Sequence, residues 1–449
     1  MQAFKNWESA GYIGLFEMAT GTGKTLTALN CAVELYNQEH HIKTVVLVPT
    51  IPLANQWKEE AQRLHFENIV MVNSKNAGWQ DEVLRLINRD FMDPVNYCLI
   101  STYASYNTPL FKSIVDKLSD DTLLIADEAH NFGTERQVSN FPHKFKRRIG
   151  LTATPTRYFD EEGTQAILEY FNSTEEATFK LDMSTAIEKG LLCRYYYYPK
   201  IVFLTTDELA SYRDISIKLV KFYNFDTQKF LDNPIATSLL LKRKRIINQA
   251  GEKINCLRQI LSELTNKYNP LEYTFVYVPE GMSDLFGAQK TRIIDAYARV
   301  ISEEFGLRQH QFIGTTKDRN TILAKFSHGE ISVLTAMKCL DEGVDVRRAE
   351  IAIFSASTGN PRQFIQRRGR ILRTHEEKKN AVIYDMVVMP SPNLKSFSDS
   401  IKIEQSLLKR ELRRVAEFAS ISENKYEALN SLQNIAREYE IDVYSVQYL

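Results

Sequence analysis

The stretch Ala19-Thr20-Gly21-Thr22-Gly23-Lys24-Thr25 decides the fold class of this 449-residue chain. It follows a short apolar run and precedes a run with helical spacing from Leu26 to Tyr36. Glycines let backbone N–H groups approach phosphate oxygens, and the N-terminus of a helix adds its positive dipole. Lys24 would neutralise the β- and γ-phosphates, and the Thr25 hydroxyl would bind Mg²⁺. The stretch predicts a P-loop, with Met18 in place of the first glycine of the general pattern; a glycine-rich turn that only caps a helix is the alternative.

Short apolar runs alternate with helical patterns on both sides of this loop, from Ile13 to about Tyr198. This alternation is typical of a parallel sheet with helices on both faces. A polar residue or a proline follows the carboxyl end of each run, where open α/β sheets bind ligands. The predicted strands are Thr44–Val48, Tyr97–Ser101, Thr122–Ala126 and Arg148–Leu151.

An acidic pair stands at the end of the third of these strands, in the sequence Asp127-Glu128-Ala129-His130. Two adjacent carboxylates at a strand's end can divide the labour of hydrolysis. Asp127 would hold Mg²⁺, and Glu128 would orient and deprotonate the water that attacks the γ-phosphate. A solvated acidic loop is the better interpretation for such a pair alone, but its place about 100 residues after a P-loop favours the functional one.

Changes between helical and strand-like hydrophobic spacing divide the rest of the chain into parts. The pattern becomes helical after about Thr205, with a basic run at Lys242–Arg245, and this predicts an inserted helical module. Strand-like runs return between Tyr273 and Tyr384, and the chain is helical again after Pro390. The expected parts are an α/β domain at 1–204, a helical insertion at 205–270, a second α/β domain at 271–390 and a helical C-terminal extension at 391–449.

The composition limits the class of protein. With 44% hydrophobic and 25% charged residues, the chain is neither disordered nor a collagen or a coiled coil. Lys and Arg number 56, as do Asp and Glu, so any binding of nucleic acid must use local patches. The five cysteines lie far apart, which predicts neither a disulfide framework nor a zinc site. Without a signal peptide or a membrane-spanning run of about 18 apolar residues, we expect a cytoplasmic protein with no membrane partner.

Read together, these motifs resemble those of the superfamily 2 helicases and translocases. The similarity is greatest to the DEAH-type branch that contains XPB-like proteins and the helicase subunits of restriction enzymes, and it covers about Phe4 to Asp385. Motif I corresponds to Gly21–Thr25 and motif II to Asp127–His130. The other matches are motif Ia at Val46–Thr50, motif III at Leu151–Pro155, motif V from Thr335 through Asp345 and motif VI at Gln363–Arg373.

This resemblance implies two tandem RecA-like domains that hold ATP and Mg²⁺ between them. By match to motif VI, Arg370 and Arg373 are arginine fingers and Gln366 lies near the attacking water; a solvated basic helix is the alternative. Motif V assigns a ribose contact to Asp345 and a close backbone turn to Gly343. The implied catalytic residues are Lys24, Asp127, Glu128, Gln366, Arg370 and Arg373; the implied nucleotide-binding residues are Thr20, Gly21, Thr22, Gly23, Lys24, Thr25, Gly343 and Asp345; and the implied Mg²⁺ ligands are Thr25 and Asp127.

In the resembling family, residues at strand ends touch the sugar-phosphate backbone. Two basic clusters, His143–Arg148 and Lys242–Arg245, would either widen this path or be solvated faces. Alternation along Tyr195–Tyr198 would bury two tyrosines and expose two, which favours a role in a sheet or domain junction over stacking on bases. Thr152 and Thr154 would link the ATP site to the nucleic acid or act as turn residues. The expected nucleic-acid contacts are Pro49, Thr50, Ser101, Thr102 and Thr335.

The implied function is that of an ATP-dependent helicase or translocase, with DNA preferred over RNA as its substrate. An RNA helicase and an ATP-gated clamp that binds nucleic acid without unwinding it remain the alternatives. The chain shows no candidate nuclease cluster, so a nuclease domain or subunit is an expected partner. In many relatives the glutamine that reads adenine lies upstream of motif I. The chain starts too late for it, and we expect either an excerpt of a longer protein or relaxed adenine recognition.

Overall fold

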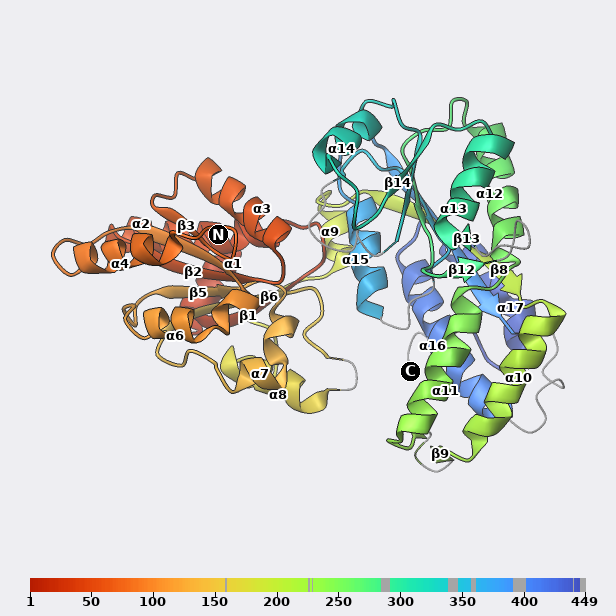
Figure 1. Ribbon diagram of the computed structural model, residues 1–449, viewed down its shortest axis with the longest axis horizontal. Coiled ribbons are helices and arrows are strands. Elements are labelled where there is room, and N and C mark those ends of the chain that lie inside the picture. Colours follow the sequence, from red (N-terminus) through yellow and green to blue (C-terminus); the bar gives the residue numbers. More distant parts are fainter. Residues whose placement is uncertain are drawn as a thin grey trace. The chain divides into compact units, whose positions relative to one another are not determined.

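The computed structural model describes residues 1–157, 160–224, 227, 229–283, 291–337, 346–356, 361–390, 401–438 and 440–444 (Figure 1). These residues form two compact units, the first containing Met1–Leu192 and the second beginning at Cys193. Each unit is built around its own parallel sheet. The expectation of two tandem α/β domains is confirmed. No helix among the described residues is long and apolar enough to cross a membrane.

A seven-stranded sheet with the order β3-β4-β2-β5-β6-β1-β7 forms the first unit, and all neighbouring strands are parallel. Every residue of β4 and β5 is buried although successive side chains point to opposite faces, so both faces of the sheet are covered. Its strands are β1 (Ile13–Met18), β2 (Lys43–Val48), β3 (Ile69–Val72), β4 (Tyr97–Thr102), β5 (Leu123–Ala126), β6 (Arg147–Thr152) and β7 (Phe179–Leu181). Its helices are α1 (Gln2–Ser9), α2 (Lys24–Glu39), α3 (Ile51–Arg63), α4 (Trp79–Asp90), α5 (Tyr103–Tyr106), α6 (Pro109–Val115), η1 (Ala129–Gly133), α7 (Glu135–Val138), α8 (Glu161–Tyr170) and α9 (Met183–Glu188).

The second unit contains a six-stranded parallel sheet with the order β14-β15-β11-β16-β17-β8. Two short antiparallel pairs, β9 with β10 and β12 with β13, lie outside it. Its strands are β8 (Arg194–Phe203), β9 (Tyr223–Asn224), β10 (Lys229–Phe230), β11 (Thr274–Tyr277), β12 (Met282–Ser283), β13 (Thr291–Arg292), β14 (Gln309–Phe312), β15 (Val333–Ala336), β16 (Ile351–Phe354) and β17 (Asn380–Met389). Its helices are α10 (Thr206–Val220), α11 (Pro234–Asn248), α12 (Lys253–Lys267), α13 (Ile293–Arg299), η2 (Val300–Glu304), α14 (Arg319–Ser327), α15 (Pro361–Ile371), α16 (Ile401–Ser420) and α17 (Lys425–Glu438).

Two parts of the chain fall elsewhere than the sequence division expects. The run Arg194–Phe203, expected in the first domain, is strand β8 and pairs along its whole length with β17 of the second sheet. Helix α12, expected in the insertion, packs its Leu257 and Leu264 into the same buried core as Val276 of β11 and Ile353 of β16. The observed division therefore lies at Leu192, and the helical module outside the sheet consists of α10, α11 and the β9–β10 hairpin.

A buried ion pair joins this helical module to the C-terminal helices. The guanidinium of Arg243 on α11 lies 2.8 Å from a carboxylate oxygen of Glu404 on α16, and their side chains are only 4% and 2% exposed. The hydroxyl of Tyr212 on α10 donates to Glu404 at 2.8 Å. Two consecutive helices, α10 and α11, thus meet the distant helix α16 at one charged pair, away from water.

We expect Arg243→Met to lower the free energy of unfolding by about 3–5 kcal/mol, because it leaves the Glu404 carboxylate buried without its cation. The change is measured from the shift of the urea denaturation curve. The double variant Arg243→Met/Glu404→Leu should recover most of the loss, since removing both charges removes the desolvation penalty. A single variant as stable as the unchanged protein would contradict the structural role of the pair.

The turn between α16 and α17 covers the outer edge of β8. The amide of Asn424 accepts a hydrogen bond from Tyr197 N at 2.8 Å and donates one to Tyr197 O at 3.0 Å. The backbone N–H of Glu423 donates to Tyr195 O at 2.9 Å. Tyr195 also donates its hydroxyl to the carbonyl of Phe418 on α16. The C-terminal helices therefore pack on the second sheet.

Candidate nucleotide-hydrolysis site

The carboxyl ends of the parallel strands bring the predicted motifs of the first unit to one edge of its sheet. The loop Ala19–Thr25 follows β1, Asp127 follows β5, and Thr152 ends β6, which lies between them. Parallel strands share one direction, so these three segments must meet at the same edge. Because β5, β6 and β1 are adjacent, motifs I, II and III lie side by side at the carboxyl edge of the sheet.

Two glycines with left-handed backbone angles shape the loop after β1. Gly21 has φ 89° and Gly23 has φ 86°, values that side chains with a Cβ rarely adopt. Gly23 is the N-cap of α2, and Lys24 is the first residue of that helix. The Thr22 hydroxyl donates to the Ala19 carbonyl at 2.7 Å and closes the loop. A helix N-terminus approached through such a glycine loop has the form of a phosphate-binding site.

Lys24 connects the loop to the acidic pair. Its ammonium nitrogen lies 3.5 Å from the carbonyl oxygen of Met18 and 3.9 Å from a carboxylate oxygen of Glu128. The side chains of Lys24 and Glu128 are 10% and 14% exposed, so this ion pair is only weakly screened by water. Residues about 100 positions apart in the sequence are thus neighbours, as the spacing of the two motifs predicts.

Asp127 is buried, and hydrogen bonds fix its carboxylate. One oxygen accepts from the indole N–H of Trp57 at 2.7 Å, and the other accepts from the backbone N–H of Glu128 at 2.8 Å. Burial, and secondarily the charge of Glu128, raises the pKa of Asp127 to about 6, while Lys24 and the Trp57 hydrogen bond act in the opposite direction. Because burial and Glu128 disfavour the charged form of Asp127, a further cation beside it would stabilise the carboxylate.

Glu128 holds a conformation that is costly for a residue with a side chain. Its backbone is left-handed, with φ 46° and ψ 54°. Such a conformation costs on the order of 1 kcal/mol and persists where the surroundings enforce it. One carboxylate oxygen of Glu128 lies 3.4 Å from Nδ1 of His130, and the other faces Lys24. Lys24 and His130 thus flank the carboxylate of Glu128 beside the phosphate loop.

Two residues that the sequence analysis missed support Asp127. The Trp57 indole from α3 bonds to its carboxylate, and the Tyr103 hydroxyl from α5 donates to its carbonyl at 2.8 Å. Both side chains are buried aromatic residues on helices, so their pattern is that of ordinary core positions. Only the contact across 70 residues of sequence identifies Trp57 as a support of the site.

Helix α15 of the second unit carries most of the motif VI residues, and Arg373 follows its end. Arg367 is 1% exposed, lies over the ring of Tyr277 and donates to the carbonyl of Ala356. Arg368 lies over the ring of Phe418 and pairs with Glu417 at 3.3 Å. A solvated basic helix therefore does not describe these two arginines. Gln366 is 6% exposed, and Arg370 and Arg373 are partly exposed. Gly343 and Asp345 lie outside the described residues.

The expected nucleic-acid contacts differ in accessibility. Pro49 and Thr50 are partly exposed after β2, and Thr50 caps α3 by accepting from Leu53 N. Thr102 is buried and caps α5. The hydroxyls of Ser101 and Thr335 are buried and donate to Val72 O and His310 O, respectively. As placed here, these last two hydroxyls support neighbouring strands rather than face solvent.

Local hydrogen bonds also account for other candidate residues. The Thr152 hydroxyl donates to Thr154 O at 2.9 Å and accepts from Thr154 N at 3.1 Å, which makes a turn after β6. In the cluster His143–Arg148, four cations have structural partners, so it is not a free basic surface. Lys144 binds the last carbonyls after α6, Lys146 pairs with Asp120, Arg147 pairs with Glu39, and Arg148 lies over the ring of Tyr170.

Comparison with known families assigns both units. Residues 1–157 match the model of the type III restriction enzyme res subunit, and residues 253–375 match that of the helicase conserved C-terminal domain. The DNA 3'-5' translocase XPB2 of Sulfurisphaera tokodaii is 28% identical over 384 residues, which cover 83% of this chain and 77% of that protein.

Solved structures share the fold. The Hef helicase domain of Pyrococcus furiosus has a TM-score of 0.55 at 16% identity, with 87% of this chain and 95% of that one covered. The type ISP restriction-modification enzyme LlaBIII bound to DNA has a TM-score of 0.56 at 16% identity, with 94% of this chain and 30% of that one covered. With its P-loop, its acidic pair and both matched domains, the chain is similar to helicases and translocases over most of its length.

Proposed function

We propose that this chain is a motor that hydrolyses ATP and uses the energy to move along DNA or to remodel it. The observation behind the proposal is that Lys24, which follows β1, lies beside Glu128 and the buried Asp127, which follow β5. The backbone N–H groups of Gly21–Lys24 would bind phosphate oxygens, and Lys24 would neutralise the β- and γ-phosphates. Glu128 would then orient the attacking water and accept its proton.

The donor atoms near the loop fit Mg²⁺. Thr25 and Asp127 offer a hydroxyl and a carboxylate, and Mg²⁺ prefers oxygen ligands with few protein carboxylates, so that phosphate oxygens and waters complete the shell. Each carboxylate oxygen of Asp127 already accepts one hydrogen bond and keeps a second lone pair for the cation. The ion, when bound, neutralises charge that develops on the phosphate oxygens.

We expect Trp57→Phe to raise the Mg²⁺ concentration for half-maximal ATPase activity about tenfold, because a supporting residue orients the carboxylate of Asp127. The measurement is an ATPase titration with Mg²⁺ at saturating ATP. Trp7→Phe is the matched control, since the Trp7 indole is equally buried but donates to the Arg148 carbonyl, away from the P-loop. Identical titrations for the two variants would contradict the role of Trp57.

In the second unit, Arg370 and Arg373 would supply positive charge to the γ-phosphate, with Gln366 near the attacking water. Such arginines stabilise the transition state only when they reach the nucleotide, and this requirement would couple hydrolysis to a change of arrangement between the two units. Motif V would add Gly343 and Asp345 to the nucleotide site. Turnover would thus depend on residues of both units.

DNA is the proposed track because the relatives include a protein named as a DNA translocase and a restriction enzyme bound to DNA. Pro49, Thr50 and Thr102 would contact its backbone together with Ser101 and Thr335, the latter two through main-chain groups. Lys242, Lys244 and Arg245 are exposed on α11 and would add phosphate contacts without reading sequence. A nuclease domain or subunit remains a proposed partner, and the cytoplasm the proposed location.

The test is the steady-state ATPase activity of the purified chain, alone and with single-stranded DNA, duplex DNA or RNA, with Glu128→Gln as the blank. Stimulation by DNA above that by RNA is the expected result. Stronger stimulation by RNA would favour the RNA helicase. Displacement of a triplex-forming strand then distinguishes a translocase from a clamp, since a clamp hydrolyses ATP without releasing the third strand.

A further inference from the structure

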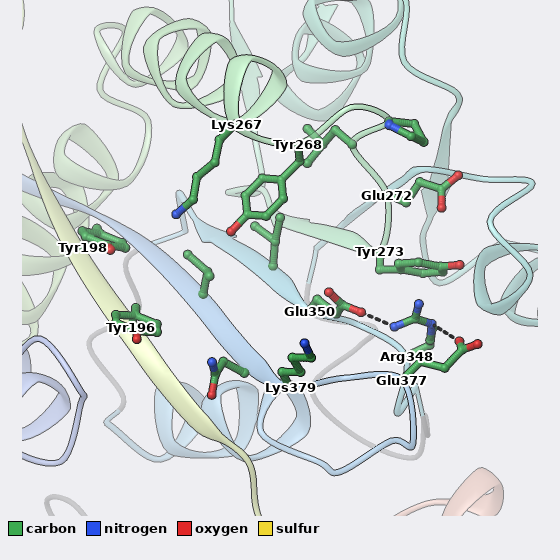
Figure 2. A pocket seen from close by; sticks show the side chains of 15 residues that line it. Tyr196, Tyr198, Lys267, Tyr268, Glu272, Tyr273, Arg348, Glu350, Glu377 and Lys379 are labelled. Carbon is green, nitrogen blue, oxygen red and sulfur yellow. Dashed lines mark hydrogen bonds and ion pairs between the residues drawn. The ribbon is translucent and has the colours of Figure 1, made fainter.

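A cavity of about 460 Å³ opens in the second unit at the amino-terminal ends of its strands (Figure 2). Strands β11, β16 and β17 begin at Thr274, Ile351 and Asn380, and the residues just before them, Tyr273, Glu350 and Lys379, line the cavity. The motif VI helix α15 instead follows the carboxyl end of β16. The cavity therefore lies at the opposite edge of the sheet and outside the proposed hydrolysis machinery.

Four tyrosines form much of the cavity wall. Tyr196 and Tyr198 come from β8, where alternation buries Tyr195 and Tyr197 on the other side and leaves these two partly exposed. Tyr268 at the end of α12 and Tyr273 before β11 complete the set (Figure 2). Aromatic rings on several sides of one space offer faces to a planar ligand.

Neighbouring groups hold two of these rings in place. The ring of Tyr198 is stacked on Tyr384, with centroids 5.3 Å apart and planes inclined by 27°. The guanidinium of Arg348 lies 3.7 Å from the ring centre of Tyr273. Rings fixed before a ligand arrives lose little side-chain entropy on binding, so the wall is suited to stacking.

Two lysines in the cavity wall are placed to meet an anion. The three carboxylates of the wall lie beside arginines instead: Glu350 and Glu377 share Arg348, and Glu272 pairs with Arg308 at 3.2 Å. Among the described residues, neither Lys267 nor Lys379 has a carboxylate within 4.0 Å. Figure 2 shows these two lysines on opposite sides of the cavity, each with its ammonium end directed toward the space. Two cations without acidic partners face the tyrosine wall.

We propose that this cavity binds one nucleotide, with the base stacked on the tyrosines and the phosphate between Lys267 and Lys379. Its volume lies within the range of sites for small molecules, and base–aromatic stacking with a nearby phosphate contact is how proteins hold unpaired bases without reading sequence. The nucleotide is either a free monophosphate or an unpaired residue of a nucleic acid strand. The site does not depend on the proposed hydrolysis of ATP.

The experiment is photo-crosslinking of the full chain with two probes, free 5-iodo-deoxyuridine monophosphate and a single-stranded oligonucleotide that contains 5-iodouracil. Tryptic peptides with adducts are then identified by mass spectrometry. We expect adducts on the peptides that contain Tyr196, Tyr198, Tyr268 or Tyr273. Adducts with the oligonucleotide alone assign the polymer as the source, and adducts with the monophosphate alone assign the free nucleotide.

Charge reversal provides the second arm. Lys267→Glu and Lys379→Glu should each lower the yield of cavity adducts about tenfold, because a charge-assisted contact to phosphate is lost. Both lysines are exposed, as is Lys325 on α14 of the same unit, and Lys325→Glu is the matched control. Adducts on peptides of the first unit serve as the internal reference. The absence of cavity adducts with both probes, or an equal yield in all three variants, would overturn the proposal.

Discussion

Arg370→Ala lowers kcat for ATP hydrolysis about 10³-fold or more and leaves the affinity for ATP within a few-fold of the unchanged protein. This result is expected because a guanidinium that reaches the γ-phosphate stabilises charge that develops only in the transition state. Steady-state ATPase rates at saturating nucleic acid give kcat, and titration with a fluorescent ATP analogue gives the affinity. The partly exposed position of Arg370 on α15 makes a loss of folding an unsuitable explanation for such a decrease.

The control for Arg370 is Arg413→Ala, which removes an exposed arginine from α16 of the same unit. Its kcat should be unchanged. Arg370→Lys should recover only part of the activity, because an ammonium lacks the planar fork that binds two phosphate oxygens at once. Normal turnover in Arg370→Ala would refute the assignment of Arg370 as a finger and leave Arg373 as the remaining candidate.

Glu128→Gln abolishes most turnover while ATP binding persists. The loss of a general base lowers kcat by roughly 10²–10⁴-fold, whereas an amide of the same size keeps the shape of the site. Single-turnover hydrolysis of labelled ATP measures the chemical step apart from product release. Equilibrium binding of the same nucleotide should change little, since the proposed role of Glu128 is to act on the water and not on the phosphates.

Lys24→Ala is the contrasting variant for Glu128→Gln. It should weaken nucleotide binding as well as hydrolysis, because the ammonium of Lys24 is proposed to neutralise the bound phosphates. The two variants therefore separate the base from the phosphate ligand, although their side chains lie only 3.9 Å apart. Wild-type hydrolysis in Glu128→Gln would show that another group accepts the proton.

The sequence predicts most of the candidate site around the P-loop because its signals are local. The glycines and Lys24 follow one another along a single loop, and Asp127 follows a short apolar run that favours a buried strand. Trp57 gives no such signal, since its role depends on a contact between α3 and β5 that no local pattern encodes. Charge runs mislead for the same reason, as Lys144 and Arg147 bind carbonyls and a carboxylate far away in the sequence.

The same distinction explains the domain boundary. The alternation along Arg194–Phe203 predicts a strand, but the sheet to which a strand belongs depends on its distant partner, here β17. Pro199 within the run is a usable signal that the strand lies at an edge, because proline cannot donate to a sheet ladder. Helix α12 shows the converse problem, since an apolar stripe at helical spacing does not reveal which core it enters.

The cover over β8 has a consequence for the solubility of the chain. Tyr197 directs its backbone N–H and C=O away from β17, toward the open edge of the sheet. Pro199, two residues further on, has its backbone at the same edge but has no N–H to donate. An uncovered strand of ten residues would recruit a strand from another molecule, as open sheet edges do in aggregation. Asn424 of the same chain already bonds to the backbone of Tyr197 at this edge, and Pro199 removes one donor from the rest of it. The turn between the last two helices thus shields this sheet edge from pairing with another molecule.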